Sequence, residues 1–358
     1  MKMSKITMRT ARSIILSLAL MLLAACAPQT PQVGVATLLA EMQTMLASAT
    51  PTPVLRSLTT QSVSAAPSIE LAETATPTPF DSPTPPPTGT ATPTAEVKAR
   101  FAVIGDFGSG SQAQTDVANL VKSWNPDFIV TTGDNNYPTG SADTIDRNIG
   151  RDYYEFIYPY LGSYGESSAP NRFFPSLGNH DWDAPNAQPY LDYFTLPGNE
   201  RYYDFTWGPV HFFIVNSDPR EPDGASSSSY QALWLKDALG ASDSTWKIVV
   251  LHASPYSSGT HGGTPWMRWP FAEWGASAVL GGHDHNYERL HIDGIPYFVN
   301  GLGGGAIYRM KTPVDGSQIR YNQDYGAMLV EADRQQINFQ FITRWGEVID
   351  NYSLNAVD

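Results

Sequence analysis

The chain has 358 residues and a formal net charge of −13, with 35 acidic side chains against 22 lysines and arginines. A general nucleic-acid-binding protein is not expected from this composition, because such proteins normally present a basic face. The single cysteine, Cys26, excludes an internal disulfide and a cysteine-based zinc site.

The sequence up to Cys26 has the pattern of a secretory signal peptide. Basic side chains lie among residues 2–12, an apolar stretch follows at residues 14–23, and two alanines precede the cysteine. That stretch is too short for a transmembrane helix. The ending Leu23-Ala24-Ala25-Cys26 resembles the lipobox of bacterial lipoproteins, which implies removal of residues 1–25 and lipidation of Cys26. The alternative is an ordinary signal peptide with an incidental cysteine.

The lipobox resemblance implies an extracytoplasmic protein that a lipid anchors to the bacterial cell envelope, or a secreted protein if the lipobox is not used. Residues 26–97 carry Thr-Pro repeats, for example at residues 76–79 and 82–87. Proline removes backbone donors and favours polyproline II, so this segment is predicted to be a disordered, semi-rigid linker. Its expected role is to hold a catalytic domain, residues 98–358, away from the membrane.

The folded sequence is predicted to begin with a strand, a helix and a second strand. Apolar runs at residues 101–104 and 128–130 flank a helical pattern at residues 112–124. These elements predict a βαβ unit with a right-handed crossover and two parallel strands. Binding sites of open α/β sheets form at the carboxyl ends of such strands.

The rest of the chain continues the alternation of helices and strands. We predict a helix at 146–161, a strand at 173–177, two strands between 202 and 216, a helix at 229–239, and strands at 248–251, 276–280, 296–300 and within 326–350. This order predicts an α/β fold with one mixed sheet or two packed sheets in a single domain.

Polar side chains of metal-binding types follow the predicted strands. They are two aspartates, a tyrosine, an asparagine and three histidines: Asp106, Asp134, Tyr137, Asn179, His252, His283 and His285. Seven ligands exceed what one metal ion uses, and they suit a pair of ions about 3.5–4 Å apart with a bridging carboxylate. Glycine precedes four of the seven, which allows the backbone to turn sharply below the site.

Several of these residues have an ordinary structural interpretation when each is considered alone. Asp106 is placed to cap the helix that follows, and Asp134 and Asn179 are typical turn residues. Tyr137 is compatible with a packed aromatic side chain, and His211, inside a predicted strand, is expected to be structural. The joint occurrence of seven such residues at successive strand ends favours a metal centre.

The complete motif set resembles the calcineurin-like metallophosphoesterase superfamily. It comprises Gly-Asp106, Gly-Asp134-x-x-Tyr137, Gly-Asn179-His180-Asp181, His252 and Gly-His283-x-His285. The tyrosine is similar to that of the purple acid phosphatase branch, and the Gly-Asp-Phe-Gly opening and the His252–His261 spacing are similar to its small, tartrate-resistant type. The resemblance covers about residues 100–300. It implies a β-sandwich of two mixed sheets flanked by helices, with the active site at the strand carboxyl ends.

The resemblance also implies how the ligands are divided. It assigns one trio to Fe(III) and the other to a divalent iron, zinc or manganese ion, with Asp134 bridging the two ions. The respective trios are Asp106, Tyr137 and His285, and Asn179, His252 and His283. A hard phenolate suits Fe(III), whereas imidazole and amide ligands suit a softer divalent ion.

A leaving group needs a proton, so an imidazole beside the metal ions is useful. His180 and His261 match histidines near the metal centre of the family, and Asp181 is expected to orient one of them. The alternatives are that His180 only hydrogen-bonds a loop and that His261 lies in a mobile loop without a role. Three tryptophans are expected either to pack as a lid or core or to line a substrate groove: Trp266, Trp269 and Trp274.

The expected function is hydrolysis of phosphomonoesters, as in an acid phosphatase, by attack of a metal-activated hydroxide. The expected partners are a small phosphorylated substrate and, through the lipid anchor, a membrane. One alternative is a phosphodiesterase or nucleotide pyrophosphatase on the same metal centre. Another is a non-catalytic surface-binding lipoprotein, against which the intact ligand set argues. The sequence leaves the oligomeric state open, and a monomer is compatible with it.

Overall fold

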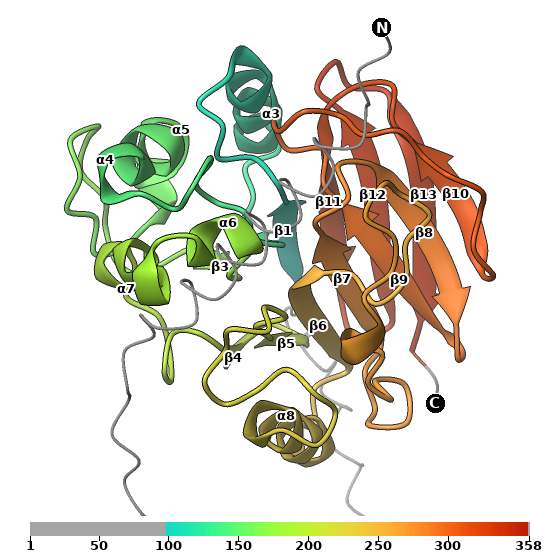
Figure 1. Cartoon of the computed structure of the whole chain (residues 1–358). Coiled ribbons are helices and arrows are strands. Elements are labelled where there is room, and N and C mark those ends of the chain that lie inside the picture. Colours follow the sequence, from blue (N-terminus) through green and yellow to red (C-terminus); the bar gives the residue numbers. More distant parts are fainter. Residues whose placement is uncertain (1–97, 357–358) are drawn as a thin grey trace, which may run out of the picture. The chain divides into compact units, whose positions relative to one another are not determined.

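The computed structural model describes residues 98–356, so the predicted signal peptide, Cys26 and the linker lie outside the described residues. Two β-sheets form the body of this part of the chain, and helices lie beside them (Figure 1). Among residues 98–356, no helix is long and apolar enough to cross a membrane.

The first sheet is mixed. Its six strands, in sheet order, are β13 (Val348–Asn355), β12 (Gln336–Thr343), β11 (Gly326–Ala332), β1 (Ala99–Ile104), β2 (Phe128–Thr131) and β3 (Phe173–Pro175). Strands β1, β2 and β3 are parallel, and the other three pair antiparallel.

The second sheet is also mixed. Its seven strands, in sheet order, are β10 (Ser317–Tyr321), β8 (Tyr287–Ile292), β9 (Ile295–Asn300), β7 (Ala278–Gly282), β6 (Trp246–Ala253), β5 (Val210–Ile214) and β4 (Tyr203–Trp207). Strands β5, β6, β7 and β9 are parallel, whereas β4, β8 and β10 run antiparallel to their neighbours.

The longer helices are α3 (Gln112–Ser123), which crosses from β1 to β2, and α8 (Tyr230–Ala241). Between β2 and β4 lie the short helices α4 (Ala142–Ile145), α5 (Arg151–Tyr153), α6 (Asn179–Trp182) and α7 (Gln188–Tyr193). Figure 1 shows helices α3 to α7 gathered beside the β1–β3 side of the first sheet, with α8 next to β4 and β5.

The apolar side chains of the central strands are buried on both faces. In β6, Ile248 and Val250 join the core shared with the first sheet, whereas Val249 and Leu251 join a second core that includes residues of α8. Burial on both faces explains why parallel strands have nearly continuous apolar sequences. Because side chains alternate along a strand, His252 continues the face that is directed toward the first sheet.

Strand register aligns the carboxyl ends that precede the candidate site. Ile104 of β1 pairs with Thr131 of β2, which in turn pairs with Pro175 of β3. In the second sheet, Ala253 of β6 pairs with Gly282 of β7. The loops that follow these strands therefore begin at the same level within each sheet.

The predicted fold class, two mixed sheets flanked by helices, is confirmed. The helix predicted at 146–161 is shifted: helical structure begins at Ala142 and ends at Phe156, ahead of Pro159. Strands β8 and β10 were not predicted, because charged and polar residues interrupt their apolar pattern. Asn179, which considered alone is a typical turn residue, begins the single turn of helix α6.

Candidate metal centre

The structure brings the seven predicted ligands together from both sheets. Asp106, Asp134 and Asn179 follow β1, β2 and β3 of the first sheet, and His252 and His283 lie at the ends of β6 and β7 of the second. Each of the seven has a polar atom within 3.4 Å of a polar atom of another. The carboxyl ends of two different sheets thus meet in one centre.

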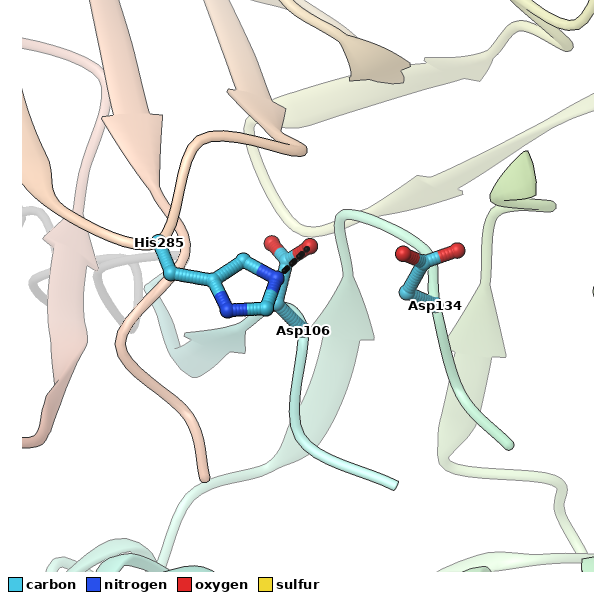
Figure 2. Close-up of side chains that lie close together, drawn as sticks. All are labelled: Asp106, Asp134 and His285. Atoms are coloured by element: carbon cyan, nitrogen blue, oxygen red, sulfur yellow. Dashed lines mark ion pairs between the residues drawn. The ribbon is translucent and has the colours of Figure 1, made fainter. Parts of the chain in front are cut away.

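The first group consists of Asp106, Tyr137 and His285. The hydroxyl oxygen of Tyr137 lies 3.3 Å from Oδ1 of Asp106, 3.0 Å from Nε2 of His285 and 3.0 Å from Oδ2 of Asp134. Figure 2 shows the carboxylate of Asp106 beside the imidazole of His285, whose Nε2 is 3.4 Å from it, and the carboxylate of Asp134 farther from that ring. One donor atom from each of Asp106, Asp134 and His285 lies within 4.8 Å of the others.

The second group consists of Asn179, His252 and His283. Nε2 of His252 lies 3.0 Å from Oδ1 of Asn179 and 3.2 Å from Nδ1 of His283. The same nitrogen is 3.4 Å from Oδ2 of Asp134. Asp134 therefore contacts both groups, which is the position that a bridging carboxylate requires.

Backbone carbonyls fix the orientation of two imidazoles. Nδ1 of His252 lies 2.8 Å from the carbonyl oxygen of Thr132, and Nδ1 of His285 lies 2.6 Å from that of Ala306. A carbonyl oxygen only accepts hydrogen bonds, so each Nδ1 carries a proton, and Nε2 is the atom that each ring, in its neutral form, presents to the centre as a lone pair. Metal-binding histidines are commonly oriented in this way.

The donor atoms fit metal ions better than they fit one another. The carboxylate of Asp106 faces Nε2 of His285, and that of Asp134 faces Nε2 of His252. The Tyr137 hydroxyl has one proton for three neighbouring acceptors. Buried lone pairs in such contact are unfavourable unless a cation lies between them. Asp106, Asp134 and His285 could therefore hold a metal ion, and the number and chemistry of the seven residues suit two ions.

Close charges dominate the electrostatics of this buried centre. Burial acts to lower the pKa of His252, but Asp134 and Asp106 raise it to about 10. Burial and the neighbouring His252 lower the pKa of His283 to about 3. Burial raises the pKa of Tyr137 well above its usual value, and the two aspartates raise it further. Bound cations would instead lower the pKa values of Tyr137 and His252, because they favour a phenolate and a neutral imidazole.

Three of the ligands have a left-handed backbone conformation. The φ angles are 54° at Asp106, 51° at Asp134 and 73° at His283. Few residues other than glycine adopt this region, and strained backbone of this kind is concentrated at functional sites. Gly133, with φ of 90°, has no space for a side chain, because a Cβ atom there would lie 2.8 Å from that of His252.

The two candidate proton donors each lie beside a different group. The ring of His180 packs against Tyr137 with centroids 4.6 Å apart, and its Nδ1 lies 2.6 Å from the carbonyl oxygen of Pro138. The exposed residue His261 stacks on His283 with ring centroids 4.2 Å apart. Both imidazoles are therefore next to the centre without belonging to its cluster of donor atoms.

Asp181 orients neither of these histidines, contrary to the prediction. Its buried carboxylate accepts hydrogen bonds from the backbone N–H groups of Gly178 and Asn135 and from the Asn135 side chain. Burial and the nearby Asp134 raise the pKa of Asp181, although these donors act to lower it. Asp181 instead joins the loop after β2 to the start of α6, which are two of the three segments that carry predicted ligands from the first sheet.

Asp284 is a residue of the site that the sequence did not reveal. Its buried carboxylate accepts the backbone N–H groups of His261 and Gly262 and the hydroxyl of Ser257. It therefore holds the loop that presents His261. Its position between His283 and His285 was the feature of the sequence that could have indicated a role. Its hydrogen-bond partners, however, lie more than twenty residues away in the sequence.

Comparison with known proteins identifies the family. The calcineurin-like phosphoesterase family matches residues 99–287, more than half of the 358 residues. Human tartrate-resistant acid phosphatase type 5 is 26% identical over 242 residues, which cover 57% of this chain and 72% of that protein. Purple acid phosphatase 17 of Arabidopsis thaliana is 28% identical over 239 residues, which cover 58% of this chain and 68% of the relative.

Solved structures share the fold. A purple acid phosphatase from yellow lupin seeds matches with a TM-score of 0.58 and 17% identity, covering 73% of this chain and 54% of the other. GAP50, described as the anchor in the inner membrane complex of Plasmodium, matches with a TM-score of 0.56 and 20% identity, covering 74% of this chain and 90% of the other. The family match spans all seven residues of the centre. This chain therefore belongs to the calcineurin-like phosphoesterase family, and it is a phosphoesterase enzyme.

Proposed function

We propose that this phosphoesterase hydrolyses phosphomonoesters with two metal ions. The observation that carries the proposal is the convergence of seven donor side chains from two sheets, with Asp134 in contact with both groups. The family depends on dinuclear metal centres. Two relatives that are 26% and 28% identical to this chain over the aligned residues are named acid phosphatases. Together these features favour a phosphatase over a binding protein.

The first group would hold one ion and the second group the other, with Asp134 between them. When bound, two cations lower the pKa of a water molecule and neutralise charge on the phosphoryl oxygens. The chain itself supplies the orientation, because Thr132 and Ala306 direct the imidazoles of His252 and His285. It also keeps bulk water away from the buried carboxylates, which strengthens their interactions with charge.

His180 and His261 are proposed to give a proton to the leaving oxygen. Neither imidazole is among the converging donor atoms, so each keeps a ring nitrogen for proton transfer. The two imidazoles have different neighbours. His180 packs against Tyr137 and the carbonyl of Pro138, whereas His261 stacks on the ring of His283. The two histidines therefore approach the centre from the sides of different groups.

The first group is proposed to hold Fe(III). This proposal is supported by the hard oxygen donors of the group, because the Tyr137 hydroxyl lies within 3.3 Å of carboxylate oxygens of Asp106 and Asp134. Tyr137→Phe should abolish the visible charge-transfer absorption of protein that still contains iron. Tyr308→Phe is the matched control, because Tyr308 stacks on His285 without lying among the donor atoms. An unchanged spectrum in Tyr137→Phe would show that Tyr137 does not bind iron.

The activity is tested with p-nitrophenyl phosphate and bis-p-nitrophenyl phosphate, which share a leaving group. The full chain is purified with its native metals, its metal content is measured, and both substrates are compared from acid to alkaline pH. We expect fast turnover of the monoester and slow turnover of the diester. The reverse ratio would identify a phosphodiesterase. No turnover of either substrate, by protein that holds its metals, would favour a surface-binding protein.

The remaining proposal concerns location and domain organisation. Its support is the lipobox resemblance at residues 23–26 and the Thr-Pro repeats that follow. Residues 1–25 would be removed, Cys26 lipidated, and residues 26–97 would link the anchor to the catalytic domain at 98–358. Mass spectrometry of the mature N-terminus and detergent partitioning test this. Cys26→Ser should move the protein from the membrane fraction to the soluble fraction, and an unlipidated native Cys26 would contradict the proposal.

A further inference from the structure

A cavity of about 390 Å³ lies directly beside the second group. Its lining includes the predicted ligands Asn179, His252 and His283. It also includes Arg220, in the loop after β5, and Trp266, in the short 3-10 helix Pro265–Met267 between β6 and β7. A phosphoryl group at the metal centre would therefore have this cavity as a neighbouring space for the rest of the substrate.

Trp266 provides an exposed ring whose position is fixed. It is 48% exposed, whereas Trp269 of the same segment is 3% exposed and belongs to the core of the second sheet. The indole N–H of Trp266 donates a hydrogen bond of 3.1 Å to the carbonyl oxygen of Ser217. An aromatic side chain that is held at one edge and open on its surface is suited to stack against a flat ligand.

Arg220 has no N–H group left for a second phosphate. Nε donates to Oδ1 of Asp218, Nη1 donates to the carbonyl of Trp182 and to Asp183, and Nη2 donates to Oδ2 of Asp218 and the carbonyl of Asn179. These five acceptors use all five donors of a guanidinium. Two carboxylates also accompany its single positive charge, so this side of the cavity does not attract another anion.

We propose that the cavity is the leaving-group subsite and that it accepts a flat, uncharged aromatic ring stacked on Trp266. The inference rests on the proposed phosphomonoesterase activity and narrows its substrates to phosphate esters of aromatic alcohols. The saturated Arg220 disfavours pyrophosphates and nucleoside polyphosphates, whose second phosphate would need an unpaired donor. Trp266 is thus assigned as a specificity-determining residue.

The test compares benzyl phosphate with cyclohexylmethyl phosphate, which have leaving groups of similar basicity but differ in flatness. We expect a higher kcat/KM for benzyl phosphate. Trp266→Ala should reduce the benzyl-to-cyclohexylmethyl ratio by about tenfold, and Trp266→Phe should keep most of it. Trp345→Ala, which removes an exposed tryptophan outside the cavity, is the matched control and should leave the ratio unchanged. An unchanged ratio in Trp266→Ala would overturn the assignment.

Binding is measured separately by calorimetry of the metal-loaded enzyme with benzylphosphonate, which cannot be hydrolysed. Trp266→Ala should raise the Kd of benzylphosphonate by about tenfold while the metal content stays constant. The phosphate ester of 4-(hydroxymethyl)benzoate should be a poorer substrate than benzyl phosphate, and a preference for this carboxylate would contradict an uncharged subsite. Absence of all monoester turnover would refute the proposed function, whereas turnover that is independent of Trp266 would refute the subsite alone.

Discussion

His252 connects the two sheets at the metal centre. Its imidazole is 1% exposed, its Nδ1 donates to the carbonyl of Thr132 in the first sheet, and its Nε2 faces Asn179 and His283. Burial acts to lower its pKa, and the carboxylates of Asp134 and Asp106 raise it. A residue with contacts to both sheets and to both groups should be intolerant of replacement.

We predict that His252→Ala abolishes turnover and releases the second metal ion. Loss of a residue that only orients a metal ligand costs about 10–100-fold in affinity or activity, so loss of a ligand should cost more than about 100-fold. Metal analysis and kcat/KM are measured on the same sample. The matched control is His211→Ala, since His211 lies on the adjacent strand and contacts Asp204 and Ser242 outside the centre. Retention of most turnover by His252→Ala would contradict its assignment as a ligand.

Asp284→Asn should disturb the loop that carries His261 while leaving the metal ions in place. The carboxylate accepts three hydrogen bonds, from Ser257, His261 and Gly262, and an asparagine has a single oxygen for them. We expect kcat to fall by about tenfold, with a changed pH profile of kcat and an unchanged metal content. Asp315→Asn, at an exposed carboxylate, is the control. Normal kcat and pH profile in Asp284→Asn would show that Asp284 does not position His261.

Several of the residues that the sequence predicted for the centre share one property. Asp106, Asp134 and His283 each follow an apolar strand and a glycine, so local sequence locates them at a strand end. The hydrogen bonds of Asp181 and Asp284 differ, because they include backbone N–H groups of distant loops: that of Asn135 for Asp181, and those of His261 and Gly262 for Asp284. Such partners depend on tertiary structure, and no pattern of residue types identifies them.

Among the elements, the helical segment from α4 to Phe156 is tied to the following loop by Asp146. This carboxylate accepts hydrogen bonds from the hydroxyls of Tyr160 and Tyr193 and from the backbone N–H and hydroxyl of Ser163. Burial acts to raise the pKa of Asp146, but these hydrogen bonds outweigh burial and lower it. The ionised form is therefore the one that the folded segment stabilises.

Asp146→Asn should lower the melting temperature by a few degrees at pH 7 and by less at pH 3. The folded pKa of Asp146 is below its unfolded value, near 4, so its stabilisation is present above that value and is lost as the pH falls through the folded pKa. Melting temperatures are measured at both pH values beside Asp237→Asn, a change at an exposed carboxylate of α8. Equal destabilisation by Asp146→Asn at both pH values would show that its charge is unimportant.

Element prediction succeeded where the apolar pattern was continuous. Strands β1, β2, β6 and β7 contain uninterrupted apolar runs, and all four were located from the sequence. Strand β8 has two adjacent charged residues, Glu288 and Arg289, which are buried and form hydrogen bonds with partners distant in the sequence. A buried charged residue lowers the apparent hydrophobicity of its strand. A buried strand of this kind is therefore recognised only when the hydrogen-bond partners of the charged residue are known.

For the whole molecule, the division of ligands between the sheets has consequences for stability. The first group combines Asp106 and Tyr137 from loops of the first sheet with His285 from the second. The second group combines Asn179 from the first sheet with His252 and His283 from the second. Each ion would therefore join the two sheets, in addition to the polar contacts that link them there, such as those of His283 N–H with Asp106 and of His252 with the carbonyl of Thr132.

Removal of the metal ions should lower the melting temperature by about 10 °C. A ligand at 1,000 times its Kd stabilises a folded protein by about 4 kcal/mol, and each kcal/mol is worth about 2–4 °C in a domain of this size. Melting is measured before and after treatment with a chelator, with metal content determined on each sample, and again after zinc and iron are restored. His252→Ala should show a smaller decrease, since it already lacks the second ion. An equal melting temperature for metal-loaded and metal-free protein would mean that the sheets are joined without the ions.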